Sequence, residues 1–75
     1  MDQKLGENPD EVFKQLQPLQ FTKNEIEQAW DYGVSEGEDV RTAWGMVQGI
    51  TAYARNLPHI DKRVNLERRA GALLN

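Results

Sequence analysis

The sequence contains no cysteine, one histidine and three prolines among its 75 residues. Without cysteine, neither a disulfide nor a thiolate-ligated metal can form. No apolar run approaches the ~18 residues that a membrane span needs, and no signal-peptide core follows Met1. These absences predict a cytoplasmic protein that has no membrane contact.

Catalytic groups are also scarce. A nucleophile–base arrangement needs a serine or threonine beside a histidine that a carboxylate holds. Ser35 is the only serine, and it lies in an acidic connection. His59 is followed by Asp61, which allows a proton shuttle, but a histidine next to Pro58 is more typical of a local turn contact. The sequence therefore predicts no enzyme, no cofactor and no catalytic residue.

Carboxylates are plentiful from Asp31 to Asp39, but they miss the alternating ligand positions and the terminal glutamate of an EF-hand. A solvated acidic loop explains this stretch better than a cation site. No metal ligand is therefore expected.

What the sequence does contain is a set of helix signals. Asn8 can cap a helix that begins at Pro9, a residue that suits the first helical position because its missing N–H costs nothing there. Thr22 and Glu25 have the spacing of a capping box. Pro18 ends the first of these two helices. Helices are thus expected over about 9–17 and 23–34.

Two longer helices are expected in the second half, capped by Asp39 or a neighbour and by Asp61, with Leu57-Pro58 between them. The third helix has two adjacent apolar stripes at helical spacing, which is typical of a central helix with several neighbours. One stripe comprises Val40, Trp44, Val47, Thr51 and Ala54, and the other Met46, Ile50, Tyr53 and Leu57. In the fourth helix, the inward positions are Val64, Leu66, Ala70, Leu73 and Leu74, and the outward positions are Lys62, Arg63, Arg68 and Arg69.

The predicted fold is therefore all-α, a small bundle of about four helices. A length of 75 residues allows one domain with a thin core. The expected bounds are approximately 9–17, 23–34, 39–56 and 62–74, with residues 1–7 frayed.

Charge is distributed unevenly along the chain. The net charge is −3, but residues 1–39 carry three lysines and ten acids, whereas residues 40–75 carry six basic residues and two acids. The two halves can complement each other within the fold, or they can serve different partners. A basic surface could contact phosphates or an acidic partner through Arg55, Lys62, Arg63, Arg68 and Arg69.

Two other features suggest contact with a protein. Gly45 and Gly49 form a GxxxG step in the third helix, and each mid-helix glycine costs about 0.5–1 kcal/mol relative to alanine. Close approach of another helix of the same chain explains this best, and a docking groove or a homodimer contact is the alternative. An exposed tryptophan would be a strong interface candidate, and Trp30 is expected to be the more exposed of the two because its helix is short and acidic.

The stretch from Thr42 to Arg55, with its Trp-Gly pair and its later Thr and Tyr, is similar to the C-terminal part of phage- and plasmid-like proteins of the domain-of-unknown-function 932 family. The segments Asp61–Glu67 and Ala70-Gly71 continue the similarity, which covers about residues 40–74. The resemblance implies a phage or mobile-element setting and no assigned catalytic residue. It leaves open whether the chain is an excised C-terminal domain or a stand-alone protein.

The sequence thus predicts a non-enzymatic protein-interaction module of phage or mobile-element origin. In one version, this chain inhibits a host defence protein, and its own acidic half imitates nucleic acid. In another, it recruits a host protein. The alternative is a small nucleic-acid-binding accessory protein that uses the basic fourth helix.

Overall fold

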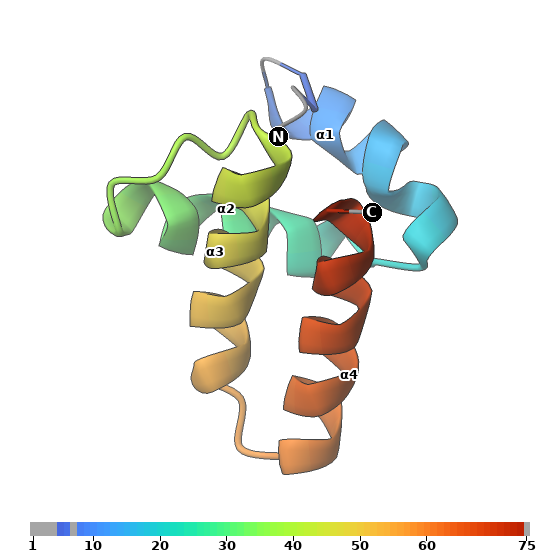
Figure 1. Cartoon of the computed structure of the whole chain (residues 1–75), viewed down its shortest axis with the longest axis vertical. Helices are drawn as coiled ribbons and strands as arrows, with labels where there is room; N and C mark the ends of the chain where they lie inside the picture. The colour runs from blue at the N-terminus through green and yellow to red at the C-terminus, as the bar shows by residue number, and fades with distance from the viewer. Residues whose placement is uncertain (1–4, 7, 75) are drawn as a thin grey trace.

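The computed structural model describes residues 5, 6 and 8–74, and this part of the chain forms four α-helices and two short 3₁₀ turns. The all-α prediction is confirmed (Figure 1). In chain order the elements are α1 (Pro9–Leu16), η1 (Gln17–Leu19), α2 (Lys23–Ser35), α3 (Ala43–Arg55), α4 (Ile60–Gly71) and η2 (Ala72–Leu74).

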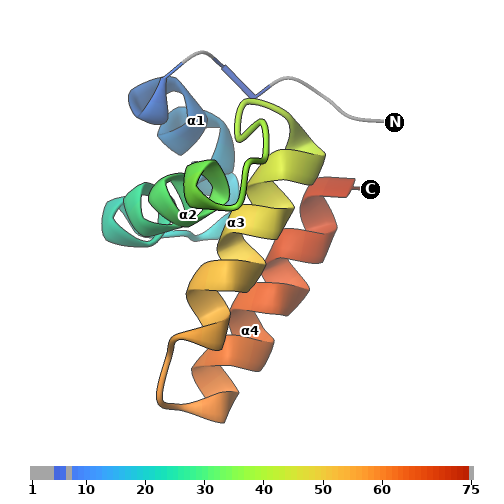
Figure 2. The ribbon, with the colours of Figure 1, turned by 90° about the vertical axis from the view of Figure 1, so that its left-hand side faces the viewer.

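Helices α3 and α4 form an antiparallel hairpin, and α1 and α2 lie on one side of it (Figure 2). Helix α3 packs against α2, α4 and η2, so its predicted central position is confirmed. All four helices and the connections between them contribute apolar side chains to one core, and no polar or charged residue of the described part is buried. The largest fully buried side chains are Leu16, Ile26, Met46, Ile50, Leu66 and Val12.

The first two helix starts are capped as the sequence predicts. The Asn8 carboxamide oxygen accepts a hydrogen bond from the Glu11 N–H at 3.0 Å. The Thr22 hydroxyl accepts from the Glu25 N–H at 3.1 Å, and the Glu25 carboxylate accepts from the Thr22 N–H at 2.8 Å. This capping box leaves the Glu25 side chain facing the hairpin, where a second contact forms.

The third helix begins later than predicted. Thr42, not Asp39, is its cap, since the Thr42 hydroxyl accepts from the Gly45 N–H at 3.0 Å. The Asp39 carboxylate is used instead by Arg41, whose backbone N–H and guanidinium both donate to it. A local turn therefore takes the acid that was expected to cap the helix.

The fourth helix begins earlier than predicted, at Ile60. His59 occupies the cap position and makes no side-chain capping bond, while Asp61 lies in the first turn. Asp61 can favour the positive end of the helix dipole from that position without being the cap.

The predicted fraying of residues 1–7 falls mostly on residues 1–4 and 7, which lie outside the described residues. Leu5 is described, and there the prediction is wrong, because this residue is buried in the core and its N–H donates to the Arg41 carbonyl.

Candidate interaction surfaces

The two glycines of α3 lie in close backbone contacts, Gly49 against α2 and Gly45 against the turn before α3. A Cβ at Gly49 would overlap the Ala29 carbonyl and lie 3.2 Å from the Gly33 Cα. A Cβ at Gly45 would overlap the Asp39 carbonyl. Both glycines are buried. Their role as a protein or homodimer interface is therefore a wrong prediction, because α2 and the turn before α3 already cover them, and the internal-packing interpretation holds.

The exposure of the two tryptophans is the reverse of the prediction. Trp30 is partly buried and packs against the core, whereas Trp44 is 47% exposed. Helix α3 is apolar around most of its circumference, so the stripe that faces the core depends on where its neighbours lie. Gly49 faces α2, and this turns Trp44 away from it. Trp44 thus replaces Trp30 as the tryptophan open to a partner.

The surface around Trp44 follows one side of α3. Since a helix turns about 100° per residue, Trp44 lies about 140° around α3 from Gly49, on the side away from α2. Gln48, Thr51 and Arg55 follow Trp44 at spacings of four, seven and eleven residues, which keeps them on this side. We call these four residues the α3 outer face. Its two ends, Trp44 and Arg55, are exposed, and the two residues between them are half-buried.

The five candidate basic residues do not form one patch. Arg55, Lys62 and Arg68 are exposed, Arg63 is half-buried, and Asp61 and Glu67 lie on the same helix as the last three. The fifth, Arg69, turns inward and is a wrong assignment for an outer contact. Phosphate contact through the remaining four residues stays a prediction.

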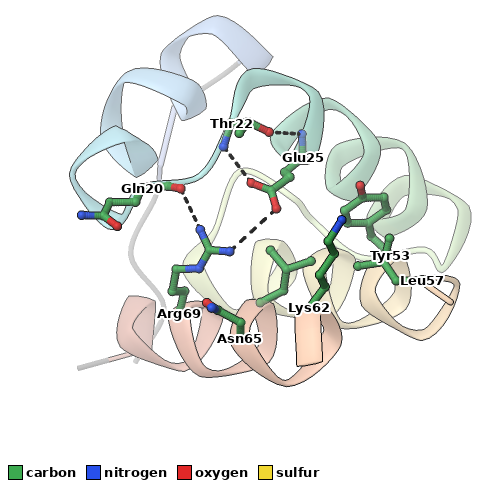
Figure 3. Close-up of a pocket in the computed structure, with 9 residues that line it drawn as sticks. Gln20, Thr22, Glu25, Tyr53, Leu57, Lys62, Asn65 and Arg69 are labelled. Atoms are coloured by element: carbon green, nitrogen blue, oxygen red, sulfur yellow. Dashed lines mark hydrogen bonds and ion pairs between the residues drawn. The ribbon is translucent and has the colours of Figure 1, made fainter. Parts of the chain in front are cut away.

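Arg69 joins α4 to the junction of η1 and α2 (Figure 3). One of its terminal N–H groups donates to the Gln20 carbonyl at 2.7 Å, and the other lies 3.8 Å from the Glu25 carboxylate. Its guanidinium also stands over the Phe21 ring, 5.0 Å from the centroid. The Gln20 carbonyl is available there because Gln20 adopts a left-handed conformation, φ 66°, that ends η1. No pattern in the sequence predicts that Arg69 binds the Gln20 carbonyl, because the two residues are 49 positions apart.

An open cavity of about 450 Å³ lies beside Arg69, between the start of α2 and the α3–α4 hairpin (Figure 3). Leu57, Leu66 and the Tyr53 ring give it an apolar side, and Lys62 and Asn65 give it a polar rim. Burial raises the pKa of Tyr53 above its ordinary value of 10.0, and the negative charges of Glu25 and of ionised Tyr32 raise it further. The two tyrosine rings are tilted, with centroids 6.1 Å apart.

His59 does not line this cavity. It is exposed at the start of α4. Among residues 5, 6 and 8–74, no group of three histidine, aspartate or glutamate side chains is placed to hold a metal ion. In the same part of the chain, every helix is too short or too polar to cross a lipid bilayer.

Comparisons of the sequence with models of known protein families and with curated proteins, and a search of solved structures, find no match. Function is therefore argued from the surfaces described above.

Proposed function

We propose that this chain is a non-enzymatic protein-interaction module that binds its partner through the α3 outer face. The observation that carries the proposal is the exposure of Trp44, 47% of whose surface is open to solvent on a helix that is otherwise central to the fold. Tryptophan contributes more binding energy than most residues when a partner buries it, and arginine is enriched at the same kind of site.

The outer face also specifies the chemistry of the partner. Arg55 lies eleven residues after Trp44, about 16 Å along the helix. A complementary partner offers an apolar pocket for the indole and a carboxylate at that distance for the guanidinium. An acidic protein surface fits better than nucleic acid, because the residues between the two ends, Gln48 and Thr51, carry no charge.

A phage or mobile-element setting for this module stays a prediction from the sequence, since no family model matches the chain. In that setting, the partner would be a host protein that the module inhibits or recruits. Glu11, Glu27 and Asp31 are exposed acidic side chains of α1 and α2 and would be available for the nucleic-acid imitation suggested by the sequence.

The test is affinity capture from bacterial lysate with wild-type protein and four variants, with bound proteins identified by mass spectrometry. Trp44→Ala and Arg55→Glu should each lower recovery of the same partner by tenfold or more, about the loss of one hot-spot contact. Val34→Ala and Lys14→Glu are matched controls, since Val34 is an exposed apolar residue of α2 and Lys14 an exposed cation of α1. These two should recover the partner as wild type does.

Equal recovery by all five proteins would contradict docking through the α3 outer face, and recovery of no protein by the wild type would contradict the binding function itself. Circular dichroism of each variant confirms that the helices are retained.

A further inference from the structure

Helix α4 and the η2 turn that follows it present a second apolar line to solvent, which we call the α4 line and which is separate from the α3 outer face. Ile60, Val64 and Leu74 are 63%, 44% and 45% exposed. Positions 60, 64, 67, 71 and 74 follow one another at alternating spacings of four and three, which is the repeat by which one helix packs along another. The line is interrupted by Glu67 and by Gly71.

Gly71 differs from the glycines of the α2–α3 contact. A Cβ built at Gly71 would meet no heavy atom of the described residues within 4 Å, whereas one at Gly33, Gly45 or Gly49 would overlap a neighbour. Its φ is not positive, so the backbone conformation does not require glycine either. Because glycine has no side chain, the surface of α4 is recessed at this point of the apolar line. The recess leaves space for a large side chain from another molecule.

Four charged side chains lie beside or within this line. Asp61 and Arg68, seven residues apart, lie along one edge of it, Arg63 lies along the other edge, and Glu67 interrupts the line on the side of Arg63. Within the described part of the chain these four residues form no ion pair. An open groove of about 300 Å³ runs along the first edge and is lined by Asp61, Val64, Asn65 and Arg68.

We infer that the α4 line binds the α4 line of a second copy of this chain in antiparallel orientation. A twofold axis perpendicular to both helices, passing between positions 65 and 66, places Ile60 of each copy opposite Gly71 of the other. The same axis keeps each edge of α4 against the same edge of its copy. Asp61 therefore faces Arg68 of the second copy, and Glu67 faces Arg63 of the second copy.

The position of Gly71 selects the antiparallel arrangement. In a parallel pair opposite charges would also meet, Asp61 with Arg63 of the second copy and Arg68 with Glu67, but Gly71 would lie opposite Gly71 and no side chain would fill either position. The antiparallel arrangement forms four ion pairs by symmetry and fills the open position at Gly71 twice. A second copy thus fits the apolar line and its charged edges together.

The experiment is sedimentation equilibrium of the full chain over low micromolar to millimolar concentrations at low salt. The wild type should move from the 8.6 kDa monomer towards twice that mass as concentration rises. Asp61→Arg and Arg68→Asp should each weaken association by about tenfold, because two attractions become two repulsions. The double variant Asp61→Arg with Arg68→Asp should restore it, since the exchanged charges again face each other.

A wild type that remains monomeric at millimolar concentration would overturn the inference, even if another protein binds the same face. Restoration is the decisive result for geometry: a double variant as weak as the single ones would exclude the antiparallel pairing. Trp44→Ala serves as the control, because it lies off the α4 line and should associate as wild type does. Loss of partner capture in that variant, with association intact, separates this inference from the proposed function.

Discussion

Arg69 is the clearest case in which one side chain has a role that its neighbours in the sequence do not suggest. It donates to the Gln20 carbonyl, lies near the Glu25 carboxylate and covers the Phe21 ring. These contacts tie the last helix to the turn between the first two. Lysine cannot replace it fully, because a single ammonium does not have the fork of donors that reaches both oxygens.

We expect Arg69→Met to lower the free energy of unfolding by about 1–3 kcal/mol, since the hydrogen bond and the charge contact are lost while most of the apolar stem remains. Urea unfolding in dilute solution measures this. Lys62→Met is the control, because Lys62 lines the same cavity and forms no ion pair with the described residues. Equal effects of the two substitutions would show that Arg69 acts only through its charge.

Tyr53 should make the stability of the fold depend on pH in the alkaline range. Because its pKa is raised in the folded chain, the folded state holds the phenol proton over a range in which the unfolded chain has lost it. The stabilisation is complete below the ordinary value of 10.0 and is lost as the pH rises through the folded pKa. Thermal unfolding between pH 9 and about 11 should therefore show a fall in stability that Tyr53→Phe reduces.

Tyr32→Phe is the matched control for this measurement. It removes only the smallest of the three causes of the raised pKa, so most of the fall should persist. If the stability of the wild type and of the Tyr53→Phe variant depended on pH in the same way, the alkaline fall in stability could not be assigned to Tyr53.

At the scale of the helices, the α2–α3 contact depends on the absence of side chains. Gly49→Ala should lower the free energy of unfolding by about 1–3 kcal/mol or more, because the new methyl group overlaps the Ala29 carbonyl and α2 must shift. Gly71→Ala, with open space at its Cβ, should instead raise stability by about 0.4–1 kcal/mol in dilute solution. Urea unfolding of both variants checks the pair. A gain in both would mean that helix propensity outweighs the overlap at Gly49, and a loss of similar size in both would contradict the open space at Gly71.

Helix starts were predictable where the signal is local. Asn8 and the Thr22–Glu25 box satisfy backbone N–H groups within three residues, so sequence spacing alone identifies them. The start of α3 was not predictable in the same way. Thr42 and Asp39 are both good caps, and the choice depends on Arg41, which binds the Asp39 carboxylate and leaves Thr42 to cap the helix.

For the molecule as a whole, the periodicity of the apolar residues was sufficient to predict the fold class. It was insufficient to predict which of those residues are exposed. Four amphipathic segments joined by short turns predict an all-α bundle. The orientation of α3 and α4 depends on packing between segments distant in sequence, and the exposed positions of Trp44, Val64 and Leu74 differ from the prediction for that reason. The candidate site follows from those positions, so it became visible only in three dimensions.

The charge asymmetry between the two halves of the chain is only partly used within the fold. Glu25–Arg69 and Asp39–Arg41 join the acidic and basic halves, whereas Lys23–Asp10 lies within the acidic half. Arg55, Lys62 and Arg68 remain exposed at the surface. Different partners for the two halves of the chain stay a prediction.

The crossing of α2 and α3 also determines how this sequence can diverge. A descendant that acquires any side chain at Gly49 must move one helix away from the other, and the hairpin would then lose its support on that side. Substitutions at the outer positions of α3 and α4 meet no such barrier. The outer surface of the domain can therefore change by single substitutions at less cost to packing than the crossing of its helices can.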